Sequence, residues 1–168
     1  MSDDYIQTVN DIEFSQLDKI TEIVAGERIS AIKYLSGEED YLEDHFPKFP
    51  VMPGVLMLEA MFQAASWLVR YTEGFSHSTV ELREAKNIKF QNFVTPGKQL
   101  EVHAKILKQD GLKYSLKTEG LLDAGVAVSG RLVVEAYNRK DRSPTMSSVD
   151  EVVAMEKHRD FKFLNSEN

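Results

Sequence analysis

Apolar residues recur along the chain with two periods, one typical of a helix and one typical of strands. Residues 55–70 contain neither glycine nor proline, and their only polar members are Glu59, Gln63, Ser66 and Arg70. The intervals between these four are four, three and four residues, which places them in one narrow stripe along an α-helix. A helix that is apolar over the rest of its circumference is normally buried. The pattern therefore predicts a buried helix with one polar stripe.

Other parts of the chain show the two-residue alternation of strands. Residues 100–106, 112–118 and 126–137 place an apolar side chain at nearly every second position, as a strand with one wet face does. Residues 80–93 are also β-like, although charged residues interrupt their centre. Before the helix, residues 17–35 contain two short apolar runs around a Gly-Glu turn, which predicts a hairpin. We therefore expect two strands, one long helix and then four antiparallel strands.

One helix that is apolar nearly all round cannot be buried by a single flat sheet, so the sheet must curl about it or a second layer must cover it. We expect the α+β class, with six antiparallel strands wrapped around one central helix. Residues 17–137 would form this domain, and residues 1–16 would be an N-terminal extension. Residues 138–168 would be a tail, in which Ser148 and Glu151 have the spacing of a capping box and predict a short amphipathic helix.

Composition narrows the class of protein. The chain has 168 residues, of which 42% are hydrophobic and 28% charged, and this suits one globular domain. It contains no cysteine, so disulfides, thiolate metal sites and cysteine nucleophiles are excluded. The net charge of −7 argues against binding to nucleic acid or to an anionic membrane. The acidic N-terminus lacks the apolar run of a signal peptide, so we expect a cytoplasmic protein.

A rigid loop that carries a histidine precedes the helix. Residues 36–44 are acidic and are expected to be a loop that leads into His45. Three prolines follow within eight residues and hold the chain out of helix and strand. Apolar, rigid neighbours limit the access of water to His45 and favour a neutral imidazole, which can act as a general base near neutral pH. A lone histidine is more often structural or exposed, and this alternative stays open.

The helix start and the polar stripe offer two further groups. Pro53 suits the first helical position, and Gly54 leaves its amide uncovered at the positive end of the helix dipole, where it can donate to a carbonyl or an oxyanion. The alternative is a plain helix start, with Gly54 present for close packing. Glu59 has apolar neighbours, and a buried carboxylate is costly without a partner or a purpose. The alternative is that Gln63 and the helix N-terminus simply stabilise it.

A histidine and a carboxylate that face a carbonyl-binding amide suit one kind of chemistry. They can remove a proton beside a carbonyl and protonate a leaving hydroxyl. Two such side chains without a third ligand do not make a metal site.

These residues also resemble a family signature. The hot-dog-fold 3-hydroxyacyl-[acyl-carrier-protein] dehydratases of fatty-acid synthesis, of the FabA/FabZ type, have a signature similar to the run His45-Phe46-Pro47-x-x-Pro50-x-x-Pro53-Gly54-Val55-Leu56-x-x-Glu59-Ala60-x-x-Gln63. The stretches 17–33 and 89–100 resemble the first hairpin and a later turn of that family. The resemblance covers residues 17–137 and leaves out both ends.

The resemblance implies a hot-dog fold, in which a six-stranded antiparallel sheet wraps around the long helix. It implies homodimers joined edge to edge, often assembled further into hexamers, with the active site at the dimer interface. His45 of one subunit would take the proton α to a thioester carbonyl, Glu59 of the other would protonate the departing hydroxyl, and the Gly54 amide would hold the thioester oxygen. No cofactor is implied, and acyl carrier protein or coenzyme A would carry the substrate. The residues expected to bind the substrate are Phe46, Pro53, Gly54, Val55, Phe62 and Gln63.

Four positions depart from the family pattern. Asp44 and Lys48 stand where the family often has glycine, and Gln91 and Asn92 stand where it often has basic residues. These changes leave the catalytic pair intact but affect the regions of substrate entry and carrier docking. We expect a dehydratase. The alternatives are a hot-dog thioesterase and a non-catalytic hot-dog protein that binds acyl chains or a partner subunit.

Overall fold

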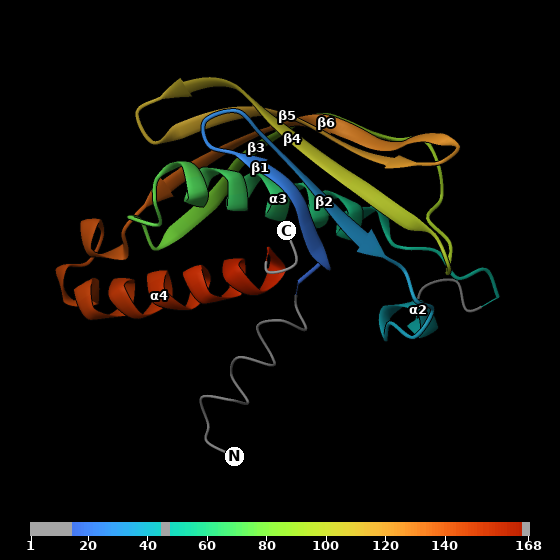
Figure 1. The fold of residues 1–168 in the computed structure, drawn as a ribbon, viewed down its shortest axis with the longest axis horizontal. Coiled ribbons are helices and arrows are strands. Elements are labelled where there is room, and N and C mark those ends of the chain that lie inside the picture. The colour runs from blue at the N-terminus through green and yellow to red at the C-terminus, as the bar shows by residue number, and fades with distance from the viewer. Residues whose placement is uncertain (1–14, 45–47, 166–168) are drawn as a thin grey trace, which may run out of the picture.

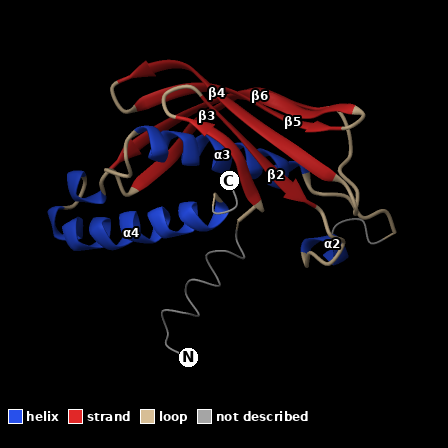
Figure 2. Ribbon diagram, viewed as in Figure 1, coloured by secondary structure: helices blue, strands red, loops and turns tan. Residues whose placement is uncertain are grey.

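A six-stranded antiparallel sheet lies against one side of a long helix, α3, and a second long helix, α4, lies on the other side (Figures 1 and 2). This computed structural model describes residues 15–44 and 48–165. The helices and strands are, in chain order, β1 (Lys19–Val24), β2 (Arg28–Tyr34), α2 (Tyr41–Asp44), α3 (Gly54–Thr72), β3 (Thr79–Phe90), β4 (Gln99–Asp110), β5 (Lys113–Leu122), β6 (Gly125–Tyr137), the short 3₁₀ turns η1 (Arg139–Asp141) and η2 (Pro144–Met146), and α4 (Ser147–Leu164).

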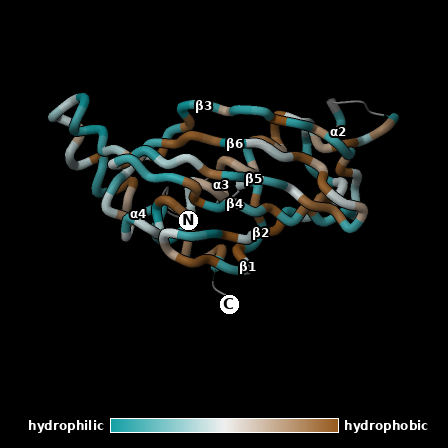
Figure 3. The backbone as a smooth tube through the Cα atoms, turned by 90° about the horizontal axis from the view of Figure 1, so that it is seen from above, coloured by the Kyte–Doolittle hydropathy of each residue, from teal (hydrophilic) through white to brown (hydrophobic). Residues whose placement is uncertain are grey.

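The strands lie in the order β1-β2-β4-β5-β6-β3, and every neighbouring pair is antiparallel. Figure 3 shows them side by side from above, with α3 beneath them. The β4–β5 hairpin turns at Gly111, whose φ of +63° favours glycine over residues that carry a Cβ. These observations confirm the expected fold class, the hairpin before the helix and the four strands after it.

The long helix packs on the sheet through small and apolar side chains. Ala60, Ala64 and Leu68 of α3 are each fully buried. Alanines at this contact let the helix axis approach the strands closely, and close packing is what a core requires. The inward faces of the central strands complete the core, with Val102, Ala104, Tyr114, Leu116, Leu132 and Val134 also buried. The predicted buried helix is thus confirmed, and it runs from Gly54 to Thr72.

The second long helix is attached to α3 by aromatic side chains. Phe161 of α4 is 6% exposed, and its ring centroid lies 6.1 Å from that of Trp67, 5.3 Å from that of Tyr71 and 5.2 Å from that of Phe75. His158, which is also on α4, stacks on Phe75 with ring centroids 4.6 Å apart. α4 therefore covers the face of α3 that the sheet leaves free.

A buried carboxylate fixes the start of α4. Asp150 is 6% exposed and accepts hydrogen bonds from the Ser78 hydroxyl at 2.5 Å, from the Arg139 amide at 2.8 Å and from the Lys140 amide at 3.0 Å. Burial alone would raise the pKa of Asp150, but the hydrogen bonds from Ser78, Lys140 and Arg139 together hold it below its ordinary value. The ionised side chain therefore ties the end of the sheet to the helix.

Three expectations for the loops and the tail were wrong. Residues 36–44 are not all loop, because α2 occupies the last four of them. The tail helix is eighteen residues long rather than short. The capping box at Ser148 is absent, since α4 begins at Ser147 after Met146 and has no side-chain cap. Hydrogen bonds from Ser78, Arg139 and Lys140 to Asp150 fix the start of α4, and the capping-box spacing does not take such distant partners into account.

Two further points concern the limits of the domain. Residues 1–14 lie outside the described part, and the division of the chain at residues 17 and 137 stays a prediction. Neither α3 nor α4, nor any shorter helix in residues 15–44 and 48–165, is long and apolar enough to cross a membrane.

Candidate active site

A cavity of about 540 Å³ lies between α3, α4 and the segment before β1. The polar stripe of α3 forms one wall, because Glu59, Gln63, Ser66 and Arg70 all line the cavity. The predicted stripe therefore faces an internal space rather than the sheet. A volume of this size is within the usual range of ligand pockets, roughly 300–1,000 Å³.

Glu59 is the carboxylate of this cavity nearest to the start of α3. It is partly buried, and its Oε1 accepts a hydrogen bond from Gln63 Nε2 at 3.1 Å. The Oε1 of Gln63 in turn accepts the backbone N–H of Gln16 at 2.7 Å. This chain of bonds fixes the orientation of the Gln63 amide, so that its NH₂ group points at Glu59. One carboxylate oxygen is thereby held in place beside the cavity.

A second charged pair lies farther along the same cavity. Arg70 is 8% exposed and donates from Nη1 to the Ser78 carbonyl at 2.9 Å. Burial lowers the pKa of Arg70 to about 10, and the negative charge of Asp160 on α4 opposes this shift. The guanidinium is therefore charged at neutral pH. Asp160 is itself 8% exposed and lines the cavity with Arg70.

Gly54 lies at a different hollow, of about 200 Å³, at the start of α3. A Cβ added to Gly54 would come within 3.1 Å of the Phe90 ring, so the glycine lets this ring approach the helix start. Pro53 is the N-cap residue, and none of the described side chains caps the helix. The amides of Leu56 and Met57 donate to the Pro53 carbonyl at 3.0 and 3.2 Å. Among the described residues the Gly54 amide has no such acceptor, so it keeps its donor character at this hollow. Its lining residues are Val51, Met52, Gly54, Met57, Phe90, Gln91, Asn92 and Phe93.

The structure brings together some of the predicted site residues and separates others. Val55, Glu59, Phe62 and Gln63 share the larger cavity. Gly54 lines the smaller hollow without them. His45 and Phe46 lie outside the described residues. The roles of all these residues stay predictions, but within one chain the amide and the carboxylate face different spaces.

Sequence reasoning missed the contribution of α4 to this site. Lys157, Asp160, Phe163 and Leu164 of α4 line the larger cavity opposite the polar stripe. Their intervals of three, three and one place two charged and two apolar side chains on neighbouring parts of one helix face. The signal in the sequence was weak, because α4 is polar over most of its length and buries only four residues.

Among residues 15–44 and 48–165, no group of three or more His, Asp or Glu side chains could hold a metal ion. The polar lining of the larger cavity comprises the carboxylates Glu59 and Asp160, the cations Arg70 and Lys157, and side chains such as Gln63 and Ser66.

Comparison with known proteins identifies the family. The model of the FabA-like domain matches residues 9–137. The chain belongs to the FabA-like family. A "3-hydroxyacyl-[acyl-carrier-protein] dehydratase FabZ" from Lactococcus lactis subsp. cremoris is 37% identical over 119 residues, which are 71% of this chain and 82% of that protein. The FabZ of Magnetococcus marinus is 35% identical over 130 residues, which are 76% of this chain and 85% of that protein.

Solved structures agree with the FabA-like fold. The dehydratase heterocomplex ApeI:P from Xenorhabdus doucetiae aligns with a TM-score of 0.65 at 18% identity, covering 80% of this chain and 91% of that chain. The PaaI protein of E. coli aligns with a TM-score of 0.56 at 10% identity, covering 71% and 79%. The match to the FabA-like family ends at residue 137, so α4 lies beyond it.

Proposed function

We propose that the protein is a dehydratase that removes water from a 3-hydroxyacyl thioester to give a 2-enoyl thioester in fatty-acid or related acyl-chain synthesis. The observation that carries this proposal is the position of Glu59, a carboxylate held by Gln63 at the wall of a ligand-sized cavity. It occupies the acid position of the family signature, and the FabZ relatives bear the name of this activity.

The residues have complementary roles in this reaction. His45 accepts the proton from the carbon next to the thioester carbonyl, and the electron pair of that C–H bond moves toward the carbonyl. The amide at Gly54 donates to the carbonyl oxygen as negative charge develops on it. Glu59 donates a proton to the β-hydroxyl, and the C–O bond breaks to release water. The electrons return to form the new double bond, so no oxidant, reductant or cofactor is required.

We place the active site at the interface of a homodimer. Within one chain Gly54 and Glu59 face different hollows, so a second copy is needed to bring the two groups to one substrate. β3 is an edge strand of the sheet and can pair with β3 of the second copy. An isologous pair of this kind contains two equivalent sites. Assembly of three such dimers into a hexamer, and a cytoplasmic location, stay predictions.

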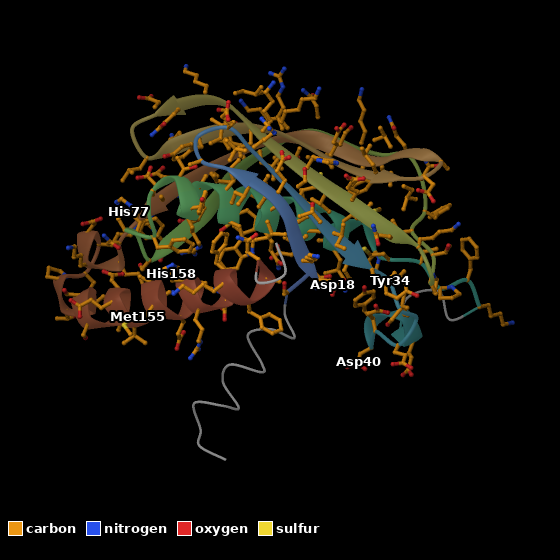
Figure 4. All side chains as sticks on the ribbon, in the orientation of Figure 1. Asp18, Tyr34, Asp40, His77, Met155 and His158 are labelled. Carbon is orange, nitrogen blue, oxygen red and sulfur yellow. The ribbon has the colours of Figure 1, made fainter. Side chains whose placement is uncertain are left out.

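The outer face of the sheet carries a band of positive charge that fits an acidic carrier. The pairings of neighbouring strands align Arg28 with Lys105, Lys105 with Lys117, Lys117 with Arg131, and Arg131 with Lys86. All five are exposed, and Figure 4 shows nitrogen-tipped side chains projecting from this face. Arg28 pairs with Glu22 at 2.6 Å and Lys86 with Glu84 at 3.0 Å, so Lys105, Lys117 and Arg131 carry the uncompensated charge of the band. Strands about 4.8 Å apart extend this band over roughly 20 Å. Like charges directly opposite one another destabilise a sheet, so the band suggests a docking function.

The experiment that tests the function is a dehydration assay. Purified protein is mixed with a 3-hydroxyacyl carrier protein or the corresponding N-acetylcysteamine thioester, and the enoyl thioester is measured. We expect turnover by the wild type and a loss of about 10²–10⁴-fold in kcat for Glu59→Gln, which retains the side-chain shape but cannot donate the proton. Glu151→Gln, on the exposed side of α4, is the matched control. Release of free thiol instead of enoyl product would favour a thioesterase and contradict the proposal.

A further inference from the structure

Helix α4 forms a wall of the Glu59 cavity that the FabA-like domain does not supply. The family match ends at residue 137, and α4 begins ten residues later at Ser147. From this helix Lys157, Asp160 and two apolar side chains line the cavity. α4 is held there firmly, by Asp150 at its start and by Phe161 farther along. Whatever occupies the cavity beyond Glu59 therefore meets side chains that lie outside the part of the chain matched to the FabA-like domain.

The charged groups on the cavity wall have unequal partners. Glu59 has Gln63, and Arg70 has the Ser78 carbonyl and the neighbouring charge of Asp160. In the described part of the chain, Lys157 makes no ion pair and no hydrogen bond. The ammonium group of Lys157 is therefore the charged donor on the α4 wall that no described residue occupies.

Arg70 and Lys157 lie at the end of the cavity that is distant from Glu59. Eleven residues separate Glu59 from Arg70, which corresponds to about 16 Å along α3. Ser66 lies between them on the same stripe, and its hydroxyl has no hydrogen-bond partner among the described residues. An acyl chain that starts at Glu59 and follows α3 would reach Ser66 and the α4 wall with its distal carbons.

The distal donors favour one class of acyl chain. A saturated chain end would cover the Lys157 ammonium and the Ser66 hydroxyl without replacing their hydrogen bonds to water, which is unfavourable. A carboxylate would pair with Lys157 but would also approach Asp160, one helical turn away. A neutral oxygen acceptor satisfies the donors without this repulsion. Resting on the dehydratase function, we propose that Lys157 and Ser66 select 3-hydroxyacyl thioesters whose distal chain carries a carbonyl or hydroxyl oxygen.

Paired substrates test this inference. One series consists of saturated 3-hydroxyacyl N-acetylcysteamine thioesters of increasing length, and the other has the same chains with a ketone at the next-to-last carbon. We expect a length at which the wild type has a higher kcat/KM for the ketone. Lys157→Met should lower kcat/KM for that ketone at least about tenfold more than for its saturated partner, which is the effect of losing one hydrogen bond from a charged donor. Lys162→Met, exposed on the same helix, should leave the ratio unchanged.

A binding experiment separates this inference from the proposed function. Trp67 is the single tryptophan of the chain and lines the cavity, so its fluorescence reports occupancy without turnover. The probes are the saturated and ketone acyl N-acetylcysteamine thioesters without the 3-hydroxyl, which cannot be dehydrated. Tighter binding of the ketone by the wild type but not by Lys157→Met supports the inference even if no dehydration occurs. Equal binding of the two probes, or an unchanged preference in Lys157→Met, would overturn it, whatever the activity.

Discussion

Removal of the Phe161 side chain should detach α4 from the domain. Phe161 is one of four buried residues of α4, and of these only Phe161 and Leu164 are apolar. Its ring lies within 6.1 Å, centroid to centroid, of Trp67, Tyr71 and Phe75. Phe161→Ala therefore removes the α4 ring that contacts all three, while His158 still stacks on Phe75.

The magnitude follows from burial. Replacing a buried phenylalanine by alanine costs about 3–5 kcal/mol, which includes the cavity that is left. For a chain of this size that corresponds to a fall in Tm of roughly 6–20 °C if the protein unfolds as one unit. If α4 opens by itself first, the cost is limited to the free energy that docks it, and the global Tm falls less. In that case the amides of α4 should exchange with solvent much faster than those of β4 and β5.

Thermal unfolding followed by circular dichroism, Trp67 fluorescence and hydrogen exchange measures both outcomes. Met155→Ala is the matched control, because Met155 is on the same helix but 73% exposed, and its replacement should change stability by at most about 0.5 kcal/mol. An equal effect of the two substitutions on Tm and on the exchange of α4 would refute the packing of α4 on α3.

Three further predictions concern other parts of the molecule. Asp150→Asn should reduce the loss of stability that occurs below about pH 4. The pKa of Asp150 is lower in the folded state than its unfolded value near 3.9, so the ionised carboxylate stabilises the fold above that pH and this stability is lost as the pH falls. Urea unfolding at several pH values measures the effect, and an equal loss of stability in acid for the wild type and the variant would contradict it. Gly54→Ala should reduce the dehydration rate more than the stability of the fold, because the new methyl meets the half-exposed ring of Phe90 at 3.1 Å and occupies the hollow at the start of α3. An unchanged kcat/KM in a folded variant would argue against hydrogen bonding of the thioester carbonyl by the Gly54 amide. Charge reversal at Lys105 and Lys117 should raise KM for a carrier-bound substrate in low salt but not for the N-acetylcysteamine thioester, and equal effects on both would exclude docking at this band.

Local pattern was enough to predict the fold. The period of residues 55–70 identified α3 and its polar stripe, and the alternation in the later segments identified β4, β5 and β6. These signals are strong because a buried face imposes its period on every residue of the element. The fold class followed, because a helix apolar nearly all round needs cover on two sides.

Helix α4, which covers the side of α3 opposite the sheet, could not be predicted from periodicity. α4 is mostly polar and is held by Asp150 and Phe161, which contact residues more than seventy positions away. Such contacts produce no periodic pattern of apolar residues in the sequence. The prediction of a capping box at Ser148 was wrong for the same reason, because distant residues determine where α4 begins. In the site, the sequence predicted Glu59 and Gly54 as functional groups but could not show that they line separate hollows.

The most direct test of the account combines two inactive variants in one dimer. His45→Ala and Glu59→Gln chains, each with a different affinity tag, are co-expressed, and the mixed dimer is isolated by two successive purifications. If each site takes its histidine from one subunit and its acid from the other, the mixed dimer contains one intact site and one doubly altered site. We predict that it recovers about half of the wild-type dehydratase activity, while either variant alone is nearly inactive. A mixed dimer as inactive as its parents, or a parent variant with wild-type turnover, would contradict the account.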